Sequence, residues 1–569
     1  MTTEKPNSRR LAYFSMEVGL EAAMPTYSGG LGVLAGDTLR AAADLGVPMV
    51  GISLLYKQGF FRQHLDIEGY QSESAYTWDP RQFLEPQDLR VTVRLSGREV
   101  RLTAWRYLIE GITGATVPVY FLDADLPENS FEERALTGQL YGGDPLYRLR
   151  QEALVGLGGL ALLQALGHTE IETYHLNEGH CALLTVGLLA DGVADGDPAK
   201  ATEEEIEAVR RRCVFTTHTP VSAGHDRFHF DLVRQVLDEP LARTIESLPF
   251  AADETLNMTY LGLFFSRNAN GVARRHGEVA QAMYPGYDVK SITNGVHAAS
   301  WTSPSMAAMF DREIPDWRTD NAYLRQVLDV QTDHVLEAHS DAKRDLLGEI
   351  MRRTGVKLDP SVMTIGFARR AATYKRADMI FSDLDALRTI AREAGPLQFV
   401  YAGKAHPHDE PAKALIRRVF EARDQLRDTL HVVYVPEHDM ALGKLLCSGV
   451  DLWLNNPQKP LEASGTSGMK AALNGVPSLS VLDGWWPEGW VEGVTGWSIG
   501  NGEMESNQED ELASLYSKLR YVIVPLFYGS PTGYGRVMRS TIGVNGAYFT
   551  AQRMMQQYMR NAYQVPGNK

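Results

Sequence analysis

Short apolar segments alternate with longer amphipathic segments along almost the whole chain. Near the N-terminus the strand-like LAYFSME precedes a glycine-rich turn, the helical VLAGDTLRAAADLG and a second strand-like segment, VPMVGISLLY. Further strand-like segments are CVFTTHTP, VKSITNGV, VMTIGFA, LQFVYAGK, HVVYVP, LWLNNP and PSLSVLD. Apolar strands that alternate with helices predict parallel sheets covered by helices on both faces. The fold class expected from this pattern is α/β.

The strand and helix pattern occurs twice, which predicts two open α/β domains with a cleft between them, at 1–300 and 301–540. A C-terminal helix at about 541–569 is expected to pack back on the first domain. Charged residues with helical spacing predict one long amphipathic helix at 329–354. Alternating residues at about 95–125 predict an antiparallel insertion in the first domain. Ligands of open α/β folds bind beyond the carboxyl ends of strands, so polar turns that follow strands are the candidate sites.

Composition excludes several classes of protein. Among the 569 residues, 71 are Asp or Glu and 56 are Lys or Arg, a net charge of −15 that disfavours binding to nucleic acid or to an anionic membrane. The three cysteines have no C-x-x-C spacing, which predicts reduced thiols in the cytoplasm. The first ten residues are polar, unlike a signal peptide. The longest apolar run, Leu154 to Gly167, is shorter than the roughly 20 residues of a membrane span and predicts a buried helix.

Three polar turns follow predicted strands in the first half. In the first, Gly29, Gly30 and Leu31 precede a helix expected to start near Val33, where free N–H groups suit an anion or a sugar hydroxyl. Glycine is also common in turns that bind nothing. The other two are Asn177-Glu178-Gly179-His180 and Thr217-His218-Thr219-Pro220. A single histidine there is more often structural than functional, and the spacings match no metal site.

A run of cations directly follows the strand-like VMTIGFA. It contains Arg369, Arg370, Lys375 and Arg376, and Lys404 follows the next strand. Cations at the end of a buried strand are costly unless they meet anions. Guanidinium and ammonium groups both suit phosphate oxygens. The position therefore favours a phosphate pocket over a solvated helix face.

The most specific segment is EASGTSGMK, from Glu462 to Lys470. Its small residues predict a tight turn in which Thr466 caps the next helix, with Lys470 in the first turns of that helix. A helix N-terminus disfavours a cation. The cost is understandable if the lysine is neutralised as a Schiff base and a phosphate satisfies the helix dipole. Pyridoxal 5'-phosphate is the aldehyde cofactor that meets both demands.

Taken together, these motifs resemble those of the α-glucan (glycogen, starch or maltodextrin) phosphorylases, in a short bacterial form. The matching segments occur in the family's order: SGGLG, LNEGH, THTP, NGVARRHGE, SITNGV, ARRAATYKR, the AGK turn and EASGTSGMK. The resemblance covers most of the chain. It implies two Rossmann-like domains that face each other across a cleft, the GT-B type of glycosyltransferase fold.

The resemblance also assigns roles residue by residue. Positions that match the family's catalytic groups are Lys470, Arg370, Lys375 and His218. Positions that match its pyridoxal 5'-phosphate site are Lys470, Thr466, Ser467 and Arg369. Positions that match its glucose and phosphate contacts are Gly29, Gly30, Leu31, Asn294, Tyr374, Glu462, Ser464 and Gly465. No metal is implied.

The implied reaction is the reversible phosphorolysis of an α-1,4-glucan by inorganic phosphate, which releases α-D-glucose 1-phosphate with retention of configuration. In this family the cofactor phosphate shuttles the proton, and its second pKa of about 6 suits general acid–base catalysis. Two other functions stay open. A nucleotide-sugar glucan synthase typically carries Glu-x7-Glu, whereas the residue eight after Glu462 is Lys470. A catalytically silent glucan-binding protein would have no reason to keep Lys470, Arg370 and Lys375 together.

Some positions depart from the animal and plant enzymes. Gly468 replaces an asparagine, Ser467 replaces a glycine, and His438 lies near the position of a tyrosine that covers the cofactor. The phosphorylation and nucleotide control of the longer enzymes is expected to be absent. The resemblance implies a homodimer.

Overall fold

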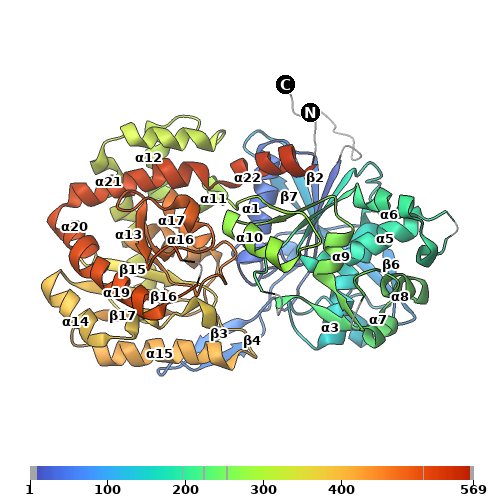
Figure 1. Cartoon of the computed structure of the whole chain (residues 1–569), viewed down its shortest axis with the longest axis horizontal. Coiled ribbons are helices and arrows are strands. Elements are labelled where there is room, and N and C mark those ends of the chain that lie inside the picture. Colours follow the sequence, from blue (N-terminus) through green and yellow to red (C-terminus); the bar gives the residue numbers. More distant parts are fainter. Residues whose placement is uncertain (1–8, 195, 222–223, 252–253, 504, 564–569) are drawn as a thin grey trace.

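The computed structural model describes residues 9–563 except 195, 222–223, 252–253 and 504 (Figure 1). It is a mixed α/β structure with two large, separate sheets. The first sheet is formed by the N-terminal half of the chain and the second by the C-terminal half. In the part of the chain that is described, no helix is both long and apolar enough to cross a membrane.

The first sheet has ten strands in the order β14-β13-β10-β9-β1-β2-β8-β7-β5, with β6 paired to β7. Its parallel strands are β1 (Leu11–Ser15), β2 (Met49–Leu54), β8 (Thr116–Asp123), β9 (Thr173–Asn177), β10 (Cys213–Thr216), β13 (Asn268–Gly271) and β14 (Val289–Ser291). Strands β1 and β2 are buried along their whole length. Continuous burial explains why these strands are apolar at most positions rather than at every second one.

The predicted insertion at 95–125 is only partly correct. Strands β5 (Glu85–Pro86), β6 (Val91–Leu95) and β7 (Arg98–Glu110) are antiparallel, as expected. Strand β8 pairs with β7 in the antiparallel sense, also as expected, but its other edge pairs with β2 in parallel, so the second segment of the expected insertion is a strand of the main sheet. The alternation in β6 and β7 could be recognised from sequence, whereas the partner of β8 depended on long-range pairing.

The second sheet has six strands in the order β17-β16-β15-β18-β19-β20, all parallel. They are β15 (Met363–Ala368), β16 (Leu397–Ala402), β17 (His431–Val435), β18 (Leu452–Asn455), β19 (Ser478–Val481) and β20 (Gly496–Ile499). The helices that cover it include α13 (Thr332–Thr354), α14 (Leu384–Glu393), α15 (Glu410–Leu426), α16 (Met440–Gly449), α17 (Ser467–Leu473), α19 (Gln508–Lys518) and α21 (Pro531–Thr541). The long helix predicted at 329–354 is α13, which begins three residues later than expected because a 3₁₀ segment, Asn321–Asp329, precedes it.

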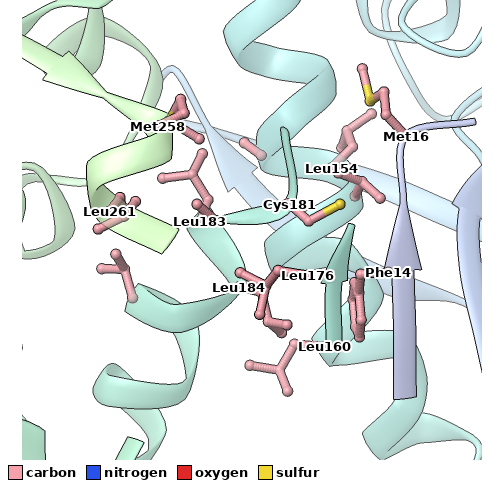
Figure 2. Packing of buried hydrophobic residues seen from close by; sticks show 14 of the residues in the cluster. Phe14, Met16, Leu154, Leu160, Leu176, Cys181, Leu183, Leu184, Met258 and Leu261 are labelled. Carbon is pink, nitrogen blue, oxygen red and sulfur yellow. The ribbon is translucent and has the colours of Figure 1, made fainter. Parts of the chain in front are cut away.

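The core of the first half forms where helices pack on the parallel strands. Figure 2 shows Phe14 of β1, Leu176 of β9 and Leu154 in one buried cluster, and Leu154 belongs to a π-type turn at Leu154–Gly158. That turn continues into α4 (Gly159–Ala165), so the apolar run is the buried helix that was expected. Cys181 is buried in this core, and all three cysteines are free and buried. Inaccessible single thiols need no oxidising environment to be stable.

Two segments connect the halves of the chain. Helix α22 (Ala551–Tyr558) returns to the first half and packs on α1 (Gly30–Asp44). Of the helix predicted at 541–569, residues 564–569 lie outside the described residues. The hairpin of β3 (Arg62–Leu65) and β4 (Gln71–Ser74) extends from the first half to α15, where Lys413 pairs with Glu73 at 3.0 Å (Figure 1).

Candidate active site

Two of the cations after β15 meet a single carboxylate. Arg369 donates from Nη2 to Glu462 at 2.6 Å, and Lys375 Nζ lies 3.0 Å from the same Glu462 oxygen. All three side chains are at least nine-tenths buried. Burial opposes ionisation of Glu462, but the charges and hydrogen bonds of Arg369 and Lys375 outweigh it and lower the pKa of Glu462 to about 2. The turn at 462–466 and the basic loop therefore form one buried ionic cluster.

The glycine at position 465 is required by the geometry of this turn. Gly465 has a φ of +83°, and a Cβ there would lie 3.3 Å from Glu462 Oε1 and 3.4 Å from Arg369 Nη2. The Glu462 N–H donates to Asp483 Oδ2 at 2.9 Å, and the Ser464 carbonyl accepts from the Trp485 N–H at 3.0 Å. Backbone contacts on both sides thus fix the turn beside the cations.

Lys470 lies in α17, which has only seven residues and begins at Ser467. Lys470 is 8% exposed, and burial lowers the pKa of its ammonium group. Its Nζ lies 3.7 Å from the centroid of the Trp301 ring and makes no ion pair within the described residues. A buried lysine with a lowered pKa is suited to forming a Schiff base. The expected helix cap is wrong: Thr466 occupies the N-cap position but its side chain makes no capping hydrogen bond.

The residues around Lys470 fit a pyridoxal phosphate group. Among the described atoms, Arg369 Nη1 and Ser464 Oγ are buried without a hydrogen-bond partner. A buried guanidinium N–H that has no acceptor is costly, and a phosphate oxygen would satisfy it. Ser467 is less free, because its Oγ accepts a hydrogen bond from Trp453 Nε1 at 3.2 Å.

Gly468 is also explained by its neighbours. A Cβ at this position would lie 3.0 Å from the Trp485 ring and 3.2 Å from Ser478 Oγ. The asparagine of the animal and plant enzymes would therefore require these side chains to move. His438 is the other departure from those enzymes, and desolvation lowers the pKa of its imidazole to about 4. His438 is therefore neutral at pH 7.

His218 lies at the end of β10, where two side chains from the end of β9 hold it. Its Nε2 is 2.7 Å from Asn177 Oδ1, and its backbone N–H donates to Glu178 Oε2 at 2.7 Å. Burial lowers the pKa of the His218 imidazole to about 3. Electrostatic repulsion from three nearby histidines, His276, His175 and His180, contributes to the same shift. The ring is therefore neutral. Because Asn177 Oδ1 can only accept, Nε2 carries the proton and Nδ1 is left as an acceptor.

The glycine turn is held by Glu17, two residues after β1. The carboxylate of Glu17 accepts from the backbone N–H of Ser28 at 2.6 Å and of Gly29 at 3.3 Å, and from the Tyr141 hydroxyl at 2.8 Å. Helix α1 begins at Gly30 rather than near Val33 as expected. Gly30 and Leu31 are thus the first two residues of this helix, whose N–H groups have no partner within the helix.

Asn294 follows β14 and is 3% exposed. Its backbone N–H donates to the Val272 carbonyl at 2.9 Å, and its own carbonyl accepts from Arg553 at 2.8 Å. Its side-chain oxygen is buried without a partner among the described residues. The backbone is therefore fixed while the amide side chain is available to a ligand.

The other predicted cations lie in different surroundings. Arg370 is exposed, and Arg376 turns away to Glu511 at 2.7 Å. Lys404 pairs with Glu437 at 2.7 Å and donates to the Phe61 carbonyl, so it does not add a free charge to the loop. Lys375 also lies 4.6 Å from the centroid of the neighbouring Tyr374 ring. The cations that are neighbours in the sequence therefore point to different partners in the structure.

Several residues of this site were not found from the sequence. Glu17, Trp301 and Asp483 are buried groups that contact predicted residues, and the buried Asp37 accepts a hydrogen bond from Trp301. Glu17 and Asp483 follow strands, which is the signal that identified the other turns. Asp37 and Trp301 carry no local signal, because each lies within an ordinary helix.

Comparison with known proteins identifies the family. Residues 212–486 match the family model described as carbohydrate phosphorylase. The chain belongs to this family, which confirms the family predicted from the motifs.

Three curated relatives show how far the similarity extends. The glycogen phosphorylase of Mycobacterium tuberculosis is 36% identical over 97% of this chain and 70% of its own length. The maltodextrin phosphorylase of Thermococcus litoralis is 36% identical with the same coverage of both chains. The glycogen phosphorylase of Aquifex aeolicus is 30% identical over 99% of this chain and 86% of its own length.

Proposed function

We propose that this protein catalyses the reversible phosphorolysis of α-1,4-glucans, a glycosyl transfer that yields α-D-glucose 1-phosphate with retention. The observation that carries the proposal is the buried cluster of Arg369, Lys375 and Glu462 in the same turn system as Lys470. The two sheets, one parallel throughout and one mainly parallel, support the further proposal of two Rossmann-like domains, at 1–300 and 301–540, that face each other across a cleft as in the GT-B fold.

Lys470 would bind pyridoxal 5'-phosphate covalently, and Arg369, Thr466 and Ser467 would hold the cofactor phosphate. When bound, the cofactor supplies a phosphate whose second pKa of about 6 lets it exchange a proton near neutral pH. Arg369 contributes its free Nη1 to this phosphate. The neutral Lys470 amine that burial favours is the form that reacts with an aldehyde.

Arg370 and Lys375 would hold inorganic phosphate beside the cofactor. Their positive charges offset the repulsion between two phosphates and stabilise charge that develops as the glycosidic bond breaks. Lys375 shares the Glu462 carboxylate with Arg369, which fixes its ammonium group before substrate binds. Arg370 is exposed, so we expect it to reach the phosphate from the solvent side.

The remaining predicted residues would bind the glucosyl unit. The first N–H groups of α1, at Gly30 and Leu31, and the Gly29 turn would lie over the glucosyl phosphate. The residues that would contact glucose hydroxyls are Asn294, Tyr374, Glu462, Ser464, Gly465 and His218. His218 would accept a hydroxyl proton at Nδ1, because its Nε2–H is held by Asn177. The unpartnered Oδ1 of Asn294 and Oγ of Ser464 suit sugar hydroxyls in the same way.

The proposal is tested with purified protein, a maltooligosaccharide and inorganic phosphate. We expect release of glucose 1-phosphate and an absorption band of bound pyridoxal that borohydride abolishes, with the label on Lys470. Consumption of a nucleotide-glucose without any need for phosphate would show a glucan synthase instead. Glucan binding without either reaction would show a silent binding protein. We expect the protein to act in the cytoplasm as a homodimer.

A further inference from the structure

Asp37 and Lys470 contact the same indole ring from different sides. Asp37 lies in α1 and is 3% exposed. Both of its carboxylate oxygens are 2.9 Å from Trp301 Nε1, which donates to them. Trp301 is the last residue of α11 (Ala298–Trp301), and Lys470 Nζ lies 3.7 Å from the centroid of its ring. A carboxylate thus binds the edge of the ring and an ammonium group its face.

This arrangement is electrostatically favourable. A cation is attracted to the negative face of an indole ring, and the attraction grows when both are removed from water. A carboxylate that accepts from the indole N–H polarises the ring in the direction that strengthens this attraction. Desolvation raises the pKa of Asp37, and the nearby charge of Lys470 reduces this shift without cancelling it.

The charged and titratable groups around Lys470 come from different elements. Asp37 faces it from α1 and Cys447 from α16, and both raise the pKa of the lysine against the effect of burial. His438, from the turn after β17, also lies close enough to interact with the lysine charge. His438 is neutral at pH 7, and burial raises the pKa of the Cys447 thiol to about 12. Of these groups Asp37 is the carboxylate, and its charge is the largest effect that opposes burial at Lys470.

We propose that Asp37 is a positioning residue for bound pyridoxal phosphate: through Trp301 it holds the Lys470 nitrogen, and it favours the cationic form of that nitrogen once the nitrogen is joined to the cofactor. This inference rests on the proposed function. Attachment joins Nζ to the aldehyde carbon as a C=N bond, and the two amine hydrogens leave with the aldehyde oxygen as water. The nitrogen of the product can then take up a proton, and Asp37 stabilises the resulting positive charge.

The decisive variant is Asp37→Asn. The amide keeps the size of the side chain and an oxygen that can accept from Trp301, but it removes the charge. Loss of a nearby anion lowers the pKa of a cation. We therefore expect the protonated C=N form of the bound cofactor to titrate about one pH unit lower than in wild type, a tenfold change in proton affinity.

The chain contains a matched control. Trp317 donates from Nε1 to Asp311 at 2.7 Å, and Arg318 lies over the Trp317 ring at 4.4 Å. This is a similar combination of carboxylate, indole and cation in the second half, but Asp311 is half-exposed and also pairs directly with Arg318 at 2.9 Å, whereas the Trp317 ring is buried. Asp311→Asn should leave the titration of the bound cofactor unchanged.

In the experiment, pyridoxal phosphate is added to the full-length protein from which cofactor has been removed. The absorbance of the bound cofactor is then measured over a series of pH values. Borohydride trapping and peptide mass analysis report attachment at Lys470, so no activity measurement is needed. If wild type never acquires the label, the proposed function fails. If wild type is labelled but Asp37→Asn titrates like Asp311→Asn, the role of Asp37 is refuted. If Asp37→Asn does not fold, Trp301→Phe, which keeps a ring but removes the N–H, must lower the midpoint; an unchanged midpoint overturns the inference.

Discussion

Replacing Glu462 with glutamine tests whether its carboxylate holds the two cations for an anion to bind. The carboxylate neutralises Arg369 at 2.6 Å and Lys375 at 3.0 Å in a site that is almost closed to water. Glu462→Gln keeps the shape but leaves both cations without a counter-charge. Removing one partner of a buried ion pair costs about 3–5 kcal/mol of unfolding free energy. We expect a loss of this size in phosphate-free buffer.

Inorganic phosphate should restore part of the lost stability. A ligand that binds only the folded state at 100 times its Kd adds about 2.7 kcal/mol. In wild type the phosphate competes with Glu462 for Lys375, whereas in the variant it meets an uncompensated charge. The stabilisation by phosphate, measured by urea unfolding and thermal scans, should therefore be larger in Glu462→Gln than in wild type. Equal stabilisation of the two proteins would refute the reasoning.

The matched control is Glu511→Gln. Glu511 is 1% exposed and pairs with Arg376 at 2.7 Å, in the same basic segment but away from Glu462. Its loss should also destabilise the protein, because the mostly buried Arg376 loses its counter-charge and keeps only the Asn456 and Pro457 carbonyls as acceptors. Phosphate should give this variant no more stabilisation than it gives wild type. If phosphate stabilised Glu511→Gln as much as Glu462→Gln, any unpaired cation near the loop would bind the anion, and the effect would not be specific to Glu462.

Three further results are expected. Arg370→Ala should lower kcat/KM on the order of 10²–10³, as removal of one charge-stabilising donor does elsewhere, while borohydride still labels Lys470. Protein reconstituted with pyridoxal, which lacks the phosphate, should be folded but inactive and should regain partial activity with added phosphite, whereas full activity without phosphite would exclude the proton-shuttle role. Asp451→Asn should cost about 3–5 kcal/mol, because Lys343 at 2.6 Å and His339 at 3.0 Å lose a buried counter-charge. Burial opposes ionisation of Asp451, but the charge of Lys343 prevails and lowers its pKa, so this stability is present above the ordinary carboxyl pKa. It is lost as the pH falls through the lowered pKa, and the difference from wild type in urea unfolding should shrink in acid; a difference independent of pH would contradict the assignment.

The sequence by itself determined the α/β class, the long helix at α13 and the family. These features are local: a strand or helix is encoded by the spacing of apolar residues, and EASGTSGMK keeps the Lys470 turn within nine consecutive residues. The same locality explains the correct expectation that the turns after strands are polar. Chemistry that depends on neighbours in the chain can be recognised before the fold is known.

Only the tertiary structure decided which groups meet. Arg369 and Glu462 lie 93 residues apart in the chain, yet they form a buried ion pair. Lys404 forms an ion pair with Glu437 and not with Glu462. Asp37 and Lys470 both contact Trp301. The sequence around Asp37 and around Trp301 gives no sign of this contact, because each residue lies in an ordinary helix. Such contacts arise when strand order and helix packing bring distant segments together. The charge and hydration of each group, and hence its pKa, follow from those contacts rather than from its position in the chain.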